Sequence, residues 1–112
     1  MQNYSNIISI DKNTFTVEEC YKCRDILLNA INLMPDSPHK EFKYAHYQNL
    51  VYRIMLGADA KTYKLKNNIK GNILETLCGS QLKKCSYLFI SASVSILLGD
   101  SFNETKNKLK EM

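Results

Sequence analysis

The first clear pattern along the chain is helical and begins at Thr16. The segment Thr16-Val17-Glu18-Glu19 matches the capping box, in which a Thr hydroxyl and a Glu carboxylate satisfy the free amides of a helix start. Apolar residues then recur on one helical face, at Cys20, Cys23, Leu27, Ile31 and Met34. Pro35 disfavours helical geometry in the residue before it, so the sequence predicts a helix that ends near Met34.

A second helix is predicted to run from Ser37-Pro38 to Leu56. Ser is a typical N-cap, Pro suits the first helical position, and Gly57 is a natural stop. The core-facing residues fall within a stripe of about 140°; they are Tyr44, Tyr47, Leu50, Val51, Ile54 and Met55. Tyr52, like Phe42 and Leu56, falls outside that stripe. Such a residue is either covered by the N-terminal segment, which we favour, or exposed as a contact anchor.

Shorter elements are predicted between Ala58 and Ser80. A helical turn begins near Asp59, and a polar loop follows over 66–71. Asn72 is placed to cap a short helix over 73–78, which Gly79 would close.

The segment 81–99 carries two conflicting periods. Serine alternates with apolar residues over 91–96, which is typical of a strand. The length of the segment and its apolar residues on both sides favour a buried helix, which is our prediction. Ser101-Phe102-Asn103-Glu104 is a further capping box and opens a charged helix through Lys110.

These patterns predict an all-α fold, a compact bundle of five to six helices with short loops. Residues 1–15 are predicted to form an N-terminal arm or a short strand, and residues 16–112 a single helical domain. A chain of 112 residues is a common size for one domain. Its composition, 45% hydrophobic and 23% charged, is that of a folded globular protein.

The sequence predicts a cytoplasmic protein with no membrane partner. The N-terminus lacks the basic region, apolar core and cleavage site of a secretory signal. The longest apolar stretch, 87–98, contains three serines and is shorter than the roughly 20 apolar residues that a membrane helix needs.

The four cysteines, Cys20, Cys23, Cys78 and Cys85, are then expected to be reduced thiols. Cys20 and Cys23 lie three residues apart on the apolar face of the first helix, where cysteine behaves as a small hydrophobe. A zinc site usually needs two closely spaced ligand pairs, whereas Cys78 and Cys85 are seven residues apart. Core thiols are therefore the favoured interpretation, with zinc binding and thiol redox chemistry as alternatives, and we predict neither metal nor cofactor.

Catalytic motifs are not evident. The acidic residues are scattered and lie mostly near helix starts, where the helix dipole explains them. The chain has no Walker loop, no GxGxxG motif and no glycine-rich elbow. We therefore predict that the protein is not an enzyme.

Charge is distributed unevenly, and this is the most informative functional feature. The whole chain has a net charge of +4, yet residues 1–36 are net negative. Residues 59–84 carry six lysines against Asp59 and Glu75. A lysine cluster of this kind neutralises phosphates and gives salt-dependent nucleic-acid binding. The candidate contact residues are Lys61, Lys64, Lys66, Lys70, Lys83, Lys84, Arg53 and Tyr63. The alternatives are a solvated surface or contact with an acidic protein.

A loose series of residues runs through positions 45–110. It consists of Asn49-Leu50-Val51-Tyr52-Arg53, Gly57, Asp59-Ala60-Lys61, Tyr63, Asn72-Ile73-Leu74, Leu82, the apolar segment to Gly99, Glu104 and Leu109. The series resembles the helical module of phage and prophage proteins of the KilA-N and antirepressor type. This chain lacks the arginine that those proteins usually carry near Leu74-Glu75-Thr76, and their N-terminal DNA-binding domain is absent from its 112 residues. The resemblance implies an origin in a phage or mobile element and a bacterial host cell.

Two mechanisms of action follow from these observations. In the first, the lysine-rich surface contacts nucleic acid and the protein is a regulator. In the second, the protein is a phage-encoded inhibitor of a host defence system, of the anti-CRISPR kind, and binds a host protein or nucleoprotein complex. The sequence leaves both open, together with the oligomeric state.

Overall fold

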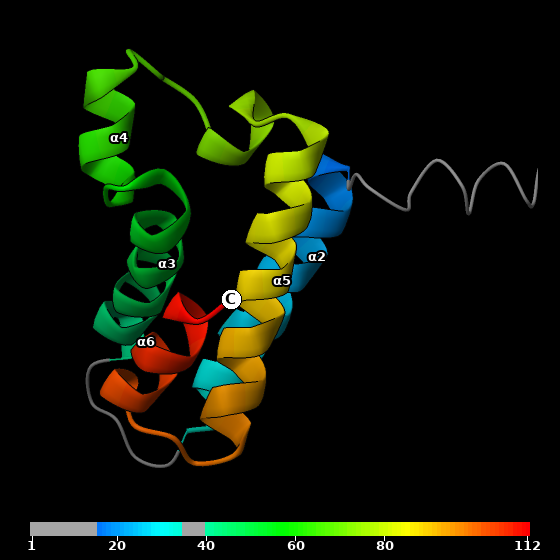
Figure 1. Ribbon diagram of the computed structural model, residues 1–112, viewed down its shortest axis with the longest axis vertical. Coiled ribbons are helices and arrows are strands. Elements are labelled where there is room, and N and C mark those ends of the chain that lie inside the picture. The colour runs from blue at the N-terminus through cyan, green and yellow to red at the C-terminus, as the bar shows by residue number, and fades with distance from the viewer. Residues whose placement is uncertain (1–15, 35–39) are drawn as a thin grey trace, which may run out of the picture.

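The computed structural model describes residues 16–34 and 40–112, and within these it is entirely helical (Figure 1). In chain order the elements are α2 (Val17–Asn32), α3 (Lys40–Leu56), α4 (Ala60–Lys66), a single 3-10 turn η1 (Ile73–Thr76), α5 (Gly79–Leu97) and α6 (Phe102–Lys110). The all-α prediction is confirmed: the described residues form five α-helices and no strand. The predicted arm over 1–15 and the predicted start at Ser37-Pro38 lie outside the described residues.

The capping box at Thr16 forms as predicted. The backbone N–H of Glu19 donates to Thr16 Oγ1 at 3.1 Å, and the backbone N–H of Thr16 donates to Glu19 Oε1 at 2.7 Å. The helix that follows packs along α5, and Figure 1 shows the two running side by side in the same direction. The residues that α2 buries are Cys20, Cys23, Leu27, Ala30 and Ile31. This pair of parallel helices makes one half of the core.

The other half of the core is α3, and here the predicted stripe is too narrow. Tyr47, Leu50 and Val51 are buried as predicted, but Tyr52 is only 5% exposed as well. Its ring meets the ring of Phe89 on α5 edge to face, at 6.2 Å between centroids. Because α3 packs against both α5 and α6, its buried face is wider than a single-partner stripe. Tyr52 is therefore buried, with α5 as one packing partner, whereas Phe42 is 68% exposed; the N-terminal segment expected to cover them lies outside the described residues.

The elements before α5 differ from the prediction. The expected helix over 73–78 is a 3-10 turn that ends at Thr76, although Asn72 caps it as predicted by accepting from the N–H of Leu74 at 3.0 Å. Gly79 does not close this element; it is the first residue of α5. The N–H of Cys78 is satisfied at that start by Gln81 Oε1, at 3.0 Å.

The serine-rich segment is a helix, as predicted, and its hydroxyls explain the strand-like pattern. Ser86 Oγ donates to the carbonyl oxygen of Leu82 at 2.7 Å, and Ser93 Oγ donates to that of Ile90 at 2.6 Å. These bonds within the helix satisfy hydroxyls that are buried among apolar side chains. Serine therefore tolerates burial on α5 without a change of secondary structure.

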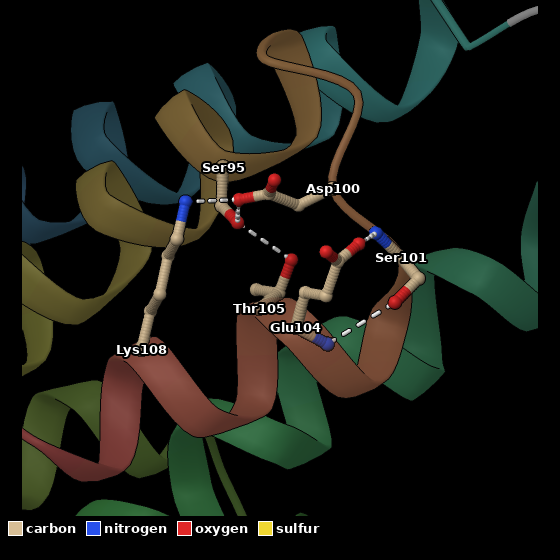
Figure 2. Close-up of polar contacts among 6 residues, drawn as sticks. All are labelled: Ser95, Asp100, Ser101, Glu104, Thr105 and Lys108. Carbon is tan, nitrogen blue, oxygen red and sulfur yellow. Dashed lines mark hydrogen bonds and ion pairs between the residues drawn. The ribbon is translucent and has the colours of Figure 1, made fainter.

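A glycine turn and a capping box connect α5 to α6. Gly99 has a φ of +88°, a left-handed conformation that favours glycine after a helix end. The capping box of Ser101 and Glu104 then starts α6, as predicted (Figure 2). Across the junction, Ser95 is hydrogen-bonded to both Thr105 and Asp100. This network fixes the angle at which α6 returns toward α3.

None of the helices over 16–34 and 40–112 has the length and apolar character needed to cross a membrane.

Candidate nucleic-acid interface

The six candidate lysines come from three consecutive parts of the fold. Lys61, Lys64 and Lys66 lie on α4, Lys70 lies in the connection to η1, and Lys83 and Lys84 lie near the start of α5. Figure 1 shows α4, this connection and the start of α5 at the same end of the molecule. We refer to the surface of these six residues as the lysine end. The structure thus brings to one end the lysines that the sequence grouped by proximity in the chain.

Two polar side chains fix the start of α4. Asp59 is its N-cap and accepts from the N–H of Thr62 at 2.9 Å. Asn49, on α3, accepts from the N–H of Ala60 at 3.0 Å. The amide of Asn49 therefore ties α4 to the helix before it. This bond positions a helix that buries none of its own residues.

The end of α4 is also set by asparagine. Asn67 is the C-cap, and its side-chain amide donates to the carbonyl oxygen of Tyr63 at 2.9 Å. Asn68 adopts a φ of +54°, which asparagine tolerates better than most residues. The Asn-Asn pair turns the chain toward η1, with Lys64 and Lys66 in the last turn of α4 before it and Lys70 in the connection after it.

Each of the two acidic residues of this segment accepts a hydrogen bond from a neutral donor. The N–H of Thr62 donates to the Asp59 carboxylate and holds its pKa below the ordinary value, and Arg53 and Lys61 add to that effect. Glu75 Oε2 accepts from the hydroxyl of Tyr21 at 2.9 Å. In contrast, the side-chain ammonium groups of five lysines make no hydrogen bond or ion pair with another described residue: Lys61, Lys64, Lys66, Lys70 and Lys84. The segment therefore presents unneutralised positive charge.

The start of α5 adds a shallow groove to the lysine end. The groove has a volume of about 290 Å³ and is lined by Ser80, Lys83, Lys84, Tyr87, Leu88 and Met112. The ammonium group of Lys83 lies 5.7 Å from the ring centroid of Tyr87, within cation–π range. An aromatic ring and two cations on one wall are suited to an unpaired base and its phosphate.

Two of the candidate residues do not join this exposed surface, although Tyr63 lies on α4 with three of the lysines. Tyr63 is half-buried and packs against the hydrophobic core, so its ring supports α4. Arg53 lies in the last turn of α3 and lines a different groove, together with Lys106 and Lys110 of α6. Sequence reasoning missed those two lysines, because only the packing of α6 on α3 brings them to Arg53.

Sequence reasoning also missed Leu65. It lies between Lys64 and Lys66 and is 75% exposed, one of the most exposed large apolar side chains in the described residues. Its place in the polar Lys-Leu-Lys triplet is the only sign of this exposure in the sequence.

The cysteines divide into a buried group and an exposed residue. Cys20 and Cys85 are fully buried where α2 meets α5, and Cys23 is nearly so. A hydrogen bond between the thiols of Cys20 and Cys85 lowers the pKa of Cys20 and, together with burial, raises that of Cys85. The prediction of core thiols is confirmed for Cys20 and Cys23; Cys85 is buried as well, whereas Cys78 is exposed. Across the part of the chain that the structure describes, no group of three or more His, Cys, Asp or Glu could hold a metal ion.

Comparisons with known proteins assign no family to the chain. No family model matches it, and no solved structure matches it. Distant similarity extends to the probable UDP-N-acetylglucosamine–peptide N-acetylglucosaminyltransferase SPINDLY of Arabidopsis thaliana, of Oryza sativa subsp. japonica and of Petunia hybrida. The identities are 26%, 28% and 26% over 94 residues, which is 82% of this chain and 10% of each transferase. Because the chain spans about a tenth of the length of these relatives, the similarity is no reason to assign their transferase activity to it.

Proposed function

We propose that the protein is a small, non-catalytic regulator that binds nucleic acid through the lysine end. In this proposal it acts in the cytoplasm of a bacterial host cell and is of the phage type that its sequence resembles. The observation that carries the proposal is the imbalance of charge at that end. The side chains of five lysines there form no hydrogen bond or ion pair with a described residue, and the two acidic residues of the segment, Asp59 and Glu75, are fewer than the lysines.

Phosphate contact is the interaction that such a surface favours. Lysine neutralises a phosphate as a point charge and reads no base, so the binding would depend strongly on salt and weakly on sequence. The exposed Leu65 would add apolar contact between Lys64 and Lys66. The groove at Lys83 and Tyr87 would accept an unpaired base, so single strands are expected to bind at least as well as duplexes.

The test compares two double variants that remove the same charge. Lys64→Gln with Lys66→Gln removes two cations from the lysine end, and Lys22→Gln with Lys43→Gln removes two from α2 and α3. Binding to labelled single-stranded and duplex oligonucleotides is measured over a range of salt concentrations. The wild type should show a steep fall of log K with log salt, and the first variant a slope smaller by roughly two units. The second variant should keep the wild-type slope, and circular dichroism should show that both are folded.

Absence of salt-dependent binding by the wild type to either oligonucleotide would contradict the proposal. If both double variants lost the same oligonucleotide affinity and salt dependence, the assignment of binding to the lysine end would be contradicted. If the wild type instead retained a host protein from a nuclease-treated lysate, the defence-inhibitor alternative would replace the regulator.

A further inference from the structure

A second basic surface lies between α3 and α6, apart from the lysine end. It is a groove of about 430 Å³, lined by Leu50, Arg53, Ile54, Lys106 and Lys110. Three of these five residues are cations, and they come from two helices that are far apart in the sequence. The other two residues are aliphatic.

The packing of the two helices explains why these cations converge. Phe102, the first residue of α6, stacks on His46 with 3.9 Å between ring centroids and meets Tyr47 edge to face at 5.1 Å. The later residues Lys106 and Lys110 lie beside the later part of α3, so the two helices run in the same direction (Figure 1). Lys106 and Lys110 are one helical turn apart, which places both on the same face of α6.

No cation of this groove is paired at close range within the described structure, although the charge of Arg53 helps to lower the pKa of Asp59 before α4. None of the three forms an ion pair with a described residue. The carboxylate of Asp100 is bound to Lys108, which does not line the groove, and that of Glu104 accepts from the N–H of Ser101. Favourable placement near helix C-termini explains a single lysine or arginine at each end. It does not explain why three of them surround one cavity.

The residues that line the groove favour an acidic protein segment over a nucleic acid as its anionic partner. Leu50 and Ile54 are aliphatic, and the groove has no aromatic residue on which a base could stack. An aliphatic side chain fits beside them. Arg53 is suited to bind a carboxylate with two parallel hydrogen bonds, and the lysines bind carboxylates as point charges.

We propose that this groove is a docking site for an acidic segment of a partner protein, in which carboxylates flank an aliphatic side chain. The aliphatic side chain lies against the half-buried Ile54, with the buried Leu50 beneath it, and the carboxylates meet Arg53, Lys106 and Lys110. The protein then has two separate binding surfaces, one for nucleic acid and one for an acidic protein segment. This inference does not depend on nucleic-acid binding at the lysine end.

The test uses a labelled synthetic peptide of glutamates with two leucines one helical turn apart. Two further peptides are matched to it, one with the leucines replaced by glutamate and one with the glutamates replaced by glutamine. The wild type should bind the first peptide at least tenfold more tightly than either of the others. Lys106→Glu with Lys110→Glu should weaken this binding by at least tenfold, and Lys106→Gln with Lys110→Gln should weaken it in the same direction if the first variant folds poorly.

The matched control is Lys64→Glu with Lys66→Glu, which changes the net charge equally at the lysine end. It should leave peptide affinity within about twofold, because charges farther apart than about 8 Å are screened at physiological salt. Three results would each overturn the inference: no binding of the acidic leucine peptide by the wild type, equal loss in the control variant, or equal binding of the peptide without leucine. If the Lys106 and Lys110 variants lose peptide binding but keep oligonucleotide binding, the peptide site is the groove and not the lysine end. The two surfaces are therefore tested separately.

Discussion

Ser95 on α5 and Thr105 on α6 are hydrogen-bonded at 2.8 Å between hydroxyl oxygens, and both side chains are almost completely buried. Ser95 has one hydroxyl proton, which it donates to Asp100 Oδ2 at 2.5 Å. The proton between the two hydroxyls therefore comes from Thr105. The result is a directed chain from Thr105 through Ser95 to a carboxylate that also binds Lys108 (Figure 2).

Ser95→Ala is expected to destabilise the protein by about 1–3 kcal/mol, because it leaves the buried hydroxyl of Thr105 without its acceptor. The double variant with Thr105→Val should lose less than the sum of the two single losses, since the two groups share one interaction. Denaturant unfolding measures both. Ser91→Ala, on the same helix, is the control and should be neutral or slightly stabilising. Additive losses would show that the two hydroxyls are not coupled.

Asp100 gives a prediction about acid stability. Hydrogen bonds from Lys108 and Ser95 hold the pKa of its carboxyl below the ordinary value of 3.8. A carboxyl with a lowered pKa in the folded state stabilises the fold above its unfolded pKa, and this contribution is lost as the pH falls through the folded pKa. Asp100→Asn should therefore be less stable than the wild type at pH 7. Thermal melts should show this difference shrinking below about pH 3.8. A difference that stayed constant with pH would contradict the assignment.

Much of the fold could be predicted because several of its helices begin or end at recognisable capping residues. The capping boxes at Thr16 and Ser101, and the left-handed glycines Gly57 and Gly99, define boundaries that need no tertiary information. At Gly79, in contrast, the local sequence predicts the wrong helix boundary. Glycine also fits the first position of a helix, and Cys78 before it is not a residue that sequence rules recognise as a cap.

The hydrogen bond from the N–H of Ala60 to Asn49 is expected to stabilise the start of α4 against α3. Asn49→Ala removes the acceptor for the N–H of Ala60, which should cost about 1 kcal/mol and free the start of α4. Hydrogen exchange at residues 60–66 should accelerate more than exchange in α5, and oligonucleotide affinity should fall. Gln48→Ala, at the neighbouring position, is the control. Unchanged exchange in α4 would mean that this bond does not position the helix.

The cysteines are expected to differ sharply in reactivity. Cys78 is exposed, and hydrogen bonds from Ser80 and the backbone of Gln81 lower the pKa of its thiol from the ordinary value of 9.0. A thiol reagent should therefore label this residue quickly in the folded protein, with the rate rising at a lower pH than for a free cysteine. The three buried thiols should react only on unfolding. Cys78→Ser should remove the fast phase, and a fast phase that persisted would place the reactive thiol elsewhere.

The candidate sites could be predicted only where chain neighbours stay neighbours in space. The lysines of α4 and its connection to η1 belong together because few residues separate them. Arg53 was named with them as a candidate, yet it lines a groove with Lys106 and Lys110, more than fifty residues later in the chain. That grouping depends on the parallel packing of α6 on α3. The stacking of Phe102 on His46 sets this packing, and no local pattern reveals it.

The most direct test of the central claim is a map of the surface that contacts nucleic acid. Isotope-labelled protein is titrated with a short single-stranded oligonucleotide, and backbone amide shifts are followed by NMR. We predict that the shifts concentrate in residues 60–72 and 79–87, and that the amides of α2 and of the α3–α6 groove change little. Shifts confined to the groove, or no shifts at concentrations that saturate ordinary non-specific binders, would contradict nucleic-acid binding at the lysine end.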